Sequence, residues 1–93
     1  MLNPSMLHEK GGSQMLPDYE YALNYVLWGR WDDLFTLMLR TKDDMLGKKI
    51  QMFLHAYYYS SQQKEIIETH DALLMYIDHA MEMYQYESQV MKV

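Results

Sequence analysis

Histidine and acidic side chains are the groups of this chain with the clearest potential for metal or acid–base chemistry. His79 lies three positions before Glu82 and directly after Asp78. A spacing of three places two side chains on one face of a helix, so His79 and Glu82 have the geometry of two ligands for one metal ion. A complete site needs further ligands, and the sequence contains no HExxH motif and no paired Glu-x-x-His motif. We therefore predict neither a metal site nor a cofactor.

Nucleophilic catalysis lacks its usual components in this sequence. There is no cysteine, so thiolate chemistry, sulfur-ligated zinc and disulfide bonds are excluded. The serines cluster near the N-terminus and at the expected breaks between helices, where capping of helix ends explains them better than catalysis does. The glycines form no phosphate-binding loop. The sequence predicts a protein that is not an enzyme and has no catalytic residues.

Acidic residues form a predicted ridge on one face of the C-terminal helix. They follow one another at steps of three, seven and four: Glu68, Asp71, Asp78 and Glu82. These steps keep the four side chains on one helical face. Such a face is commonly just solvated, but it could also dock on a basic protein. One alternative function is therefore an acidic inhibitor that imitates DNA and blocks a nucleic-acid-binding protein.

Basic side chains gather in the middle of the chain, but acidic neighbours offset them. Lys48 and Lys49 form a pair and are candidate anion-binding residues. With a stacking tyrosine they could hold a nucleotide, so a small-ligand binder with a pocket between subunits is a second alternative. The net charge of −5 and the pI near 5.2 disfavour direct binding of nucleic acid or of an anionic membrane surface.

Methionine and tyrosine are unusually abundant, with ten and nine residues. Methionine adapts to irregular partners, and tyrosine combines a broad apolar ring with a polar tip, so both suit protein interfaces. The predicted core does not hold all of them. Three consecutive tyrosines at 57–59 cannot all face inward, because successive helical residues are about 100° apart. The candidate partner-binding residues are Met75, Tyr76, Met83, Tyr86 and Tyr58.

The elements that carry these residues are predicted to be helices. Pro17 with the acidic residues after it indicates a helix start, Gly29 indicates a stop, and Thr41 or Asp43 is expected to cap the third helix. The stretch 62–88 has no glycine or proline, and its apolar residues recur at steps of three and four. We predict an all-α fold, a small helical bundle of four helices with a long C-terminal helix, over residues 17–28, 31–41, 43–59 and 62–88.

Periodicity divides the chain into an arm and one domain. Residues 1–16 carry proline, serine and a Gly-Gly pair without a helical pattern and are predicted to form a flexible N-terminal arm. Residues 17–93 are predicted to form a single helical domain, because a chain this short supports one core. In the predicted helix over 62–88, the apolar stripe that faces the core includes Ile67 and His70. The expected core residues are Tyr25, Val26, Leu34, Phe35, Leu37, Ile50, Phe53, Leu54, Leu73, Leu74 and Ile77.

The predicted function is a noncatalytic protein–protein interaction module. The surplus of apolar side chains indicates a self-associating small adaptor or inhibitor, a dimer that binds an unidentified protein through a Met/Tyr-rich helical surface. A phage or mobile-element accessory protein would have this character. No run of about 18 apolar residues is present, and the N-terminal residues lack the apolar block of a signal peptide. We therefore expect a cytoplasmic protein without a membrane partner.

Overall fold

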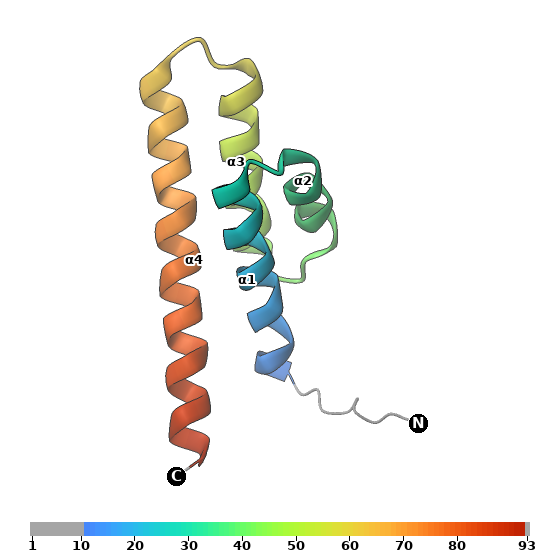
Figure 1. Ribbon diagram of the computed structural model, residues 1–93, viewed down its shortest axis with the longest axis vertical. Coiled ribbons are helices and arrows are strands. Elements are labelled where there is room, and N and C mark those ends of the chain that lie inside the picture. The colour runs from blue at the N-terminus through green and yellow to red at the C-terminus, as the bar shows by residue number, and fades with distance from the viewer. Residues whose placement is uncertain (1–10, 93) are drawn as a thin grey trace.

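Residues 11–92 form four α-helices in the computed structural model, which describes these residues and the side chains of residues 16–84. The helices are α1 (Gly11–Trp28), α2 (Trp31–Arg40), α3 (Asp44–Tyr59) and α4 (Gln63–Lys92) (Figure 1). The predicted all-α fold with a long C-terminal helix is confirmed. Within the described residues, no helix combines the length and the apolarity that crossing a bilayer requires.

The first helix begins earlier than the sequence pattern indicated. It starts at Gly11, and Pro17 lies inside it. The prediction of a helix start at Pro17 is therefore wrong, and residues 11–16 are helical. Inside a helix, proline keeps a suitable φ angle but removes one amide donor, and its ring crowds the carbonyl four residues earlier, so α1 tolerates Pro17 at a local cost. Residues 1–10 of the predicted arm lie outside the described residues.

The breaks between helices follow the expected local chemistry. Gly29 adopts a φ of 68° and closes α1, with a 3.3 Å bond from its amide to the Val26 carbonyl and a 2.8 Å bond from the Arg30 amide to the Tyr25 carbonyl. This pair of bonds is the Schellman arrangement, in which glycine avoids the cost that a Cβ atom meets at positive φ. Asp43 is the N-cap of α3. The predicted stop at Gly29 and the predicted cap at Asp43 are both confirmed.

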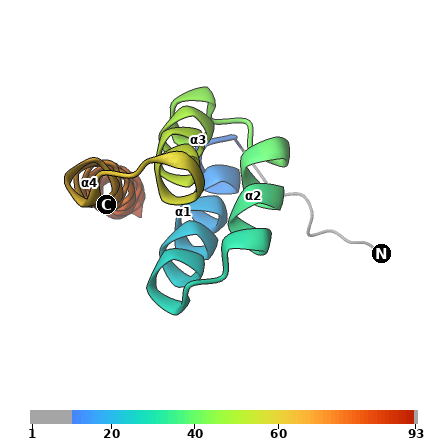
Figure 2. The same ribbon diagram turned by 90° about the horizontal axis from the view of Figure 1, so that it is seen from above.

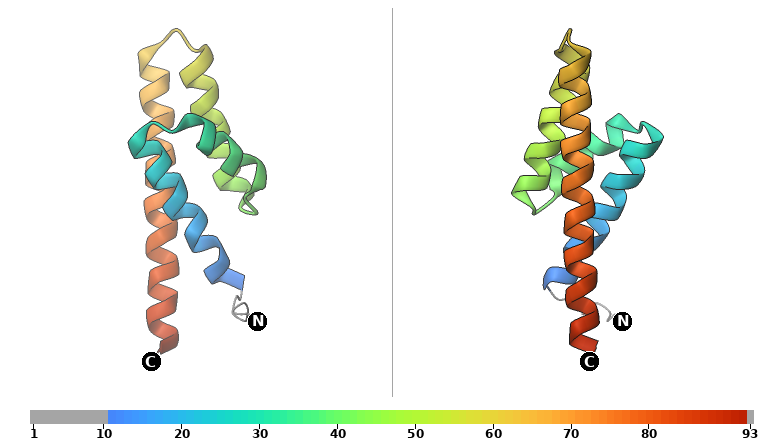
Figure 3. Two further views of the ribbon diagram at one scale, coloured as in Figure 1. Left: turned by 45° about the vertical axis from the view of Figure 1, so that its right-hand side comes forward. Right: turned by 90° about the vertical axis from the view of Figure 1, so that its left-hand side faces the viewer.

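The helices pack as a ring in which each contacts its neighbours in the chain. α1 packs on α2 and α4, and α3 packs on the same two helices. Seen from above, α4 and α2 lie on opposite sides of a layer formed by α1 and α3 (Figure 2). Within α4, α3 covers the turns near Gln63 and α1 covers later turns (Figure 3). The 30-residue α4 sets the longest dimension of the molecule, 49 Å against 29 Å and 22 Å.

The core contains most of the residues expected there. Phe35 and Ile67 are exceptions, because each is 49 % exposed, so their assignment to the core is wrong. In α2 the inward positions are Leu34 and Leu37, and Phe35 is rotated by about 100° from Leu34. Tyr19 is buried and adds a core residue that the apolar pattern does not predict. The predicted core residues that are buried are Val26, Leu34, Leu37, Ile50, Phe53, Leu54, Leu73 and Ile77.

Candidate functional site

Asp43 joins three helices through hydrogen bonds from both of its carboxylate oxygens. Oδ1 accepts bonds from the backbone amides of Met45 and Leu46, at 3.0 Å and 3.1 Å, and so caps α3. Oδ2 accepts a 2.7 Å bond from the hydroxyl of Tyr76 on α4 and a further bond from the hydroxyl of Tyr19 on α1. We call Asp43, Tyr19 and Tyr76 the Asp43 cluster. It ties the start of α3 to both α1 and α4.

The protonation states in this cluster are fixed near neutral pH. Burial works to raise the pKa of Asp43, but hydrogen bonds from Tyr19, Tyr76 and two amides outweigh it and hold the pKa below the ordinary 3.8. Burial, the hydrogen bond to Asp43 and the charge of that carboxylate raise the pKa of Tyr76 to about 12. The same causes raise the pKa of Tyr19 further. Near neutral pH, Asp43 is therefore ionised and both tyrosines keep their protons. The cluster holds helices together and has no group that exchanges a proton in this range.

A second set of polar contacts extends the cluster toward α2. The Thr41 hydroxyl donates a 2.8 Å bond to Oδ2 of Asp18 and accepts a 3.3 Å bond from the Asp43 amide. Arg40 lies 3.6 Å from the other carboxylate oxygen of Asp18. These contacts fasten α1 to the connection between α2 and α3. The polar side chains predicted only as turn or cap residues thus fix the relative positions of the helices.

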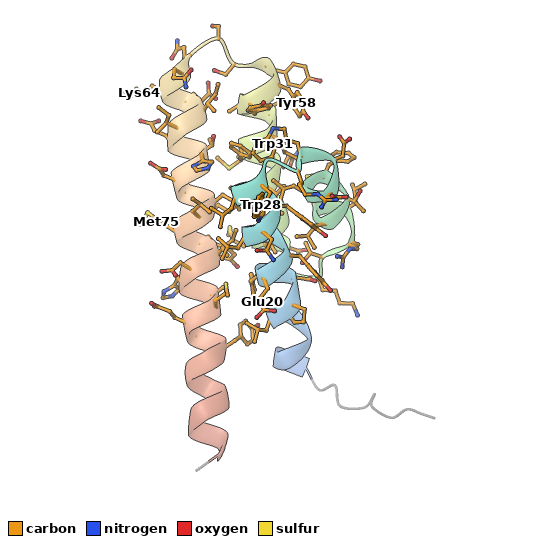
Figure 4. All side chains as sticks on the ribbon, in the orientation of Figure 1. Glu20, Trp28, Trp31, Tyr58, Lys64 and Met75 are labelled. Atoms are coloured by element: carbon orange, nitrogen blue, oxygen red, sulfur yellow. The ribbon has the colours of Figure 1, made fainter. Side chains whose placement is uncertain are left out.

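The predicted partner-binding residues of α4 lie in different surroundings. Tyr76 is half-buried in the Asp43 cluster, so its assignment to an exposed partner-binding surface is wrong. Met75 is 72 % exposed and points away from the other helices (Figure 4), and Met83 is also exposed. Tyr86 belongs to α4, but its side chain lies outside the described residues. Whether Met75 and Met83 bind a partner stays a prediction.

The predicted acidic ridge surrounds Met75. Its four residues precede or follow Met75 by three to seven positions, which places them within one face of α4. All four are exposed: Glu68, Asp71, Asp78 and Glu82. Lys64 lies 4.0 Å from Glu68 at one end of this face. The outer face of α4 is thus an acidic face with one methionine at its centre, and a role as a DNA-mimic surface stays a prediction.

A groove between α2 and α3 gathers exposed aromatic side chains from both helices. Its volume is about 450 Å³. Tyr58 of α3 belongs to it and is 56 % exposed, and Trp31 of α2 lies near it in Figure 4. Lys48 and Lys49 do not line the groove, so an anion site on this pair stays a prediction. The groove is lined by Trp31, Asp32, Phe35, Met38, Gln51, Leu54, His55, Tyr58 and Tyr59.

Packing holds the inner wall of the groove in place. The Trp31 ring lies 5.2 Å from the buried Phe53 ring and 5.1 Å from the Tyr57 ring. Leu54 is buried and forms part of the floor. The outer wall consists of Phe35 and other exposed rings. Sequence periodicity could have indicated that single rings face outward, because Phe35 lies off the inward face of its helix and Tyr58 belongs to the tyrosine run, but it does not bring the two helices together.

Comparison with known proteins places the chain in a family. The sequence profile of the YhdB-like protein family matches residues 14–84. The chain belongs to the YhdB-like family. YhdB of Bacillus subtilis (strain 168), described as an uncharacterized protein, is 45 % identical over 73 residues, which are 78 % of this chain and 90 % of that protein. No solved structure matches the chain significantly.

The stretch matched to the YhdB-like family includes both the Asp43 cluster and the groove. The two features differ in what they can do. In the Asp43 cluster, both carboxylate oxygens and both tyrosine hydroxyls are engaged in bonds within the protein, which gives the cluster a structural role. In the groove, aromatic and aliphatic atoms lie open to solvent beside Asp32, Gln51 and His55. An apolar hollow with a few polar groups at its edge is the usual form of a binding site.

Proposed function

We propose that this YhdB-like chain is a noncatalytic protein–protein interaction module, a small adaptor or inhibitor that binds another protein through the groove between α2 and α3. The observation that carries the proposal is the groove itself. Aromatic residues and methionine are enriched at interface centres, and rings such as Phe35 and Tyr58 would lose solvent contact only against a partner. A cysteine-free chain suits action in a reducing compartment such as the cytoplasm.

The fold supports a binding role in a second way. α2 and α3 hold the groove on two packed helices, so its walls are positioned before a partner arrives. A preformed site avoids part of the ordering entropy that binding otherwise costs. Trp31 connects this surface to the core through Phe53, which limits the motion of the inner wall. The groove therefore combines an inner wall that packs on the core with the composition of a protein-binding surface.

The test compares two exposed apolar residues on different faces. Phe35→Gln removes an exposed side chain of the groove, and Met75→Gln removes an exposed side chain on the outer face of α4. Both tagged full-length variants and the wild type are used to capture proteins from the cells that produce the chain. Circular dichroism and urea unfolding establish that each variant is folded.

We expect the same protein to co-purify with the wild type and with Met75→Gln, and its yield to fall at least about tenfold with Phe35→Gln. A loss of this size matches removal of one central aromatic side chain, on the order of 1.4 kcal/mol or more. Equal yields with all three proteins would refute a binding role for the groove. A loss confined to Met75→Gln would move the binding surface to α4.

A further inference from the structure

We infer that the natural occupant of the groove is an amphipathic helix of another protein that carries lysine or arginine beside its apolar face. This inference rests on the proposed function and names the chemistry of the partner. Along α3 the groove runs from Gln51 to Tyr59, a length of about 12 Å or two helical turns. Two turns accommodate apolar anchors at positions i, i+3 or i+4, and i+7 of a helix, which is the usual pattern of helix-in-groove recognition.

The floor and walls of the groove match apolar anchors. Leu54 and Met38 offer aliphatic contact, and the flexible thioether of Met38 adjusts to leucine, methionine or phenylalanine on a partner. The groove lies between two antiparallel helices, so a third helix laid along it would pack by the same ridge-and-groove rules as the rest of the bundle. The described part of the chain has no strand, so it offers an extended peptide no sheet edge to join.

The charge around the groove selects a basic partner. The groove contains Asp32, and the adjoining hollow, formed by His55, Tyr59 and the turn before α4, contains Glu65. Neither hollow is lined by a lysine or an arginine. A third hollow shares Asp32 with the groove and contains Arg30, but the guanidinium of Arg30 is paired with Asp33. No described cationic side chain forms an ion pair with Asp32 or Glu65. An approaching cation would therefore meet unneutralised carboxylates.

Aromatic rings add to this selectivity. Lysine or arginine side chains are attracted to the faces of Trp, Tyr and Phe rings, and the groove presents Trp31, Phe35 and Tyr58 together with Asp32. Arg40 already lies 5.7 Å from the centre of the Tyr21 ring within this chain. A second copy of the chain is a poorer occupant, because its net charge is −5 and the outer face of its α4 is acidic. A like-charged surface would be repelled by Asp32 and Glu65.

The experiment titrates the full chain with three synthetic peptides of about 15 residues, a length at which an isolated helix begins to form. The first carries leucines at helical spacing and lysines elsewhere. The second replaces each lysine by glutamate, and the third shuffles the first so that the apolar stripe is lost. Calorimetry measures Kd, and backbone amide NMR shifts locate the binding surface. Tyr58→Ala and Asp32→Asn are the groove variants, with Met75→Ala as the matched control.

We expect the basic amphipathic peptide to bind at the groove at least about tenfold more tightly than either other peptide, because only it satisfies both the apolar anchors and the acidic edge. Tyr58→Ala should weaken binding about tenfold or more. Asp32→Asn should weaken it about two- to fivefold, as expected for one exposed charge. Met75→Ala should leave Kd unchanged.

Other outcomes overturn the inference in distinguishable ways. Equal binding of the acidic peptide would refute the basic partner but leave an apolar docking groove. Equal binding of the shuffled peptide would refute a helical partner. If no peptide binds while Phe35→Gln still abolishes capture from cells, the proposed function stands and this occupant does not. Dimerisation through the groove, detected by light scattering and reversed by Tyr58→Ala, would make a second copy the occupant.

Discussion

The hydroxyl of Tyr76 on α4 donates a 2.7 Å hydrogen bond to Oδ2 of Asp43, the residue that caps α3. The two residues are 33 positions apart, and the bond joins the start of one helix to the middle of another. Tyr19 on α1 donates to the same oxygen. A single carboxylate therefore sets the relation of α1, α3 and α4.

Replacing this carboxylate should destabilise the protein substantially. For Asp43→Ala we expect the free energy of unfolding to fall by about 3 kcal/mol, of which about 1 kcal/mol is the lost cap and about 2 kcal/mol the lost hydrogen bonds to a charged acceptor. The measurement is urea unfolding followed by circular dichroism. The matched control is Asp44→Ala at the exposed first position of α3, which should cost less than about 1 kcal/mol.

Tyr76→Phe separates the hydrogen bond from the packing of the ring. We expect a loss of about 1–2 kcal/mol, because the ring stays and one bond to a charged acceptor is removed. Tyr59→Phe, at a strongly exposed position, should change stability by less than about 0.5 kcal/mol. If Tyr76→Phe were as harmless as Tyr59→Phe, the Asp43 cluster would not be a stabilising unit.

Stability should depend on pH through the same cluster, with opposite signs at the two ends of the range. The pKa of Asp43 lies below its ordinary 3.8, so its contribution is present above that pH and is lost as the pH falls through the lower folded value. The pKa of Tyr76 is raised from 10.0 to about 12, so its contribution is complete below pH 10 and is lost as the pH rises toward 12.

The check is urea unfolding of the wild type, Asp43→Asn and Tyr76→Phe from acidic to alkaline pH. The stability difference between wild type and Asp43→Asn should shrink on the acidic side, and that between wild type and Tyr76→Phe should shrink on the alkaline side. Differences that stay constant across both ends would contradict the proposed coupling of protonation to folding.

Two glycines should respond to substitution with opposite signs. Gly29 has a φ of 68°, so Gly29→Ala should cost about 1 kcal/mol through the left-handed conformation, and Gly29→Asn should cost less. Gly47 lies within α3, and a Cβ atom there would meet the Met38 carbonyl at an ordinary 3.5 Å. Gly47→Ala should therefore add about 1 kcal/mol of stability. Thermal unfolding of the three variants tests both signs; a destabilised Gly47→Ala would mean that α3 and the end of α2 pack too tightly to accept a methyl group.

The outer face of α4 should keep copies of the chain apart. Composition alone predicts a dimer, but two such faces brought together around Met75 would oppose rows of acidic residues that include Glu68 and Glu82, and like charges facing each other across an interface disfavour association. At low salt and neutral pH we expect light scattering to give the monomer mass of 11.2 kDa. A dimer that Met75→Gln abolishes would show that methionine packing overcomes this repulsion.

Much of the architecture follows from local sequence chemistry. Gly29 and Asp43 act as expected because a positive φ and an unsatisfied helix N-terminus each have few chemical solutions. The apolar stripe of α4 likewise placed Leu73 and Ile77 in the core. These features depend on residues a few positions apart, so the sequence alone was sufficient.

The candidate sites depend on contacts that periodicity does not contain. A helical pattern assigns Tyr76 to a face but does not say that Asp43 of another helix lies opposite it. The apolar character of Phe35 predicts a core position, whereas the short α2 buries only the side that meets α1 and α3. The groove arises from the pairing of α2 with α3, and its recognition requires both helices in place.

The ring of helices described above also suggests an order of assembly. Within residues 11–92, every packed pair of helices consists of chain neighbours except α1 and α4. Contacts between chain neighbours need little loop closure, so the three successive hairpins should form rapidly and independently of the ends. Closure of α1 against α4 would then come last, and the bond from Tyr19 of α1 to Asp43 would be added to an α3–α4 hairpin that Tyr76 already joins to the same carboxylate.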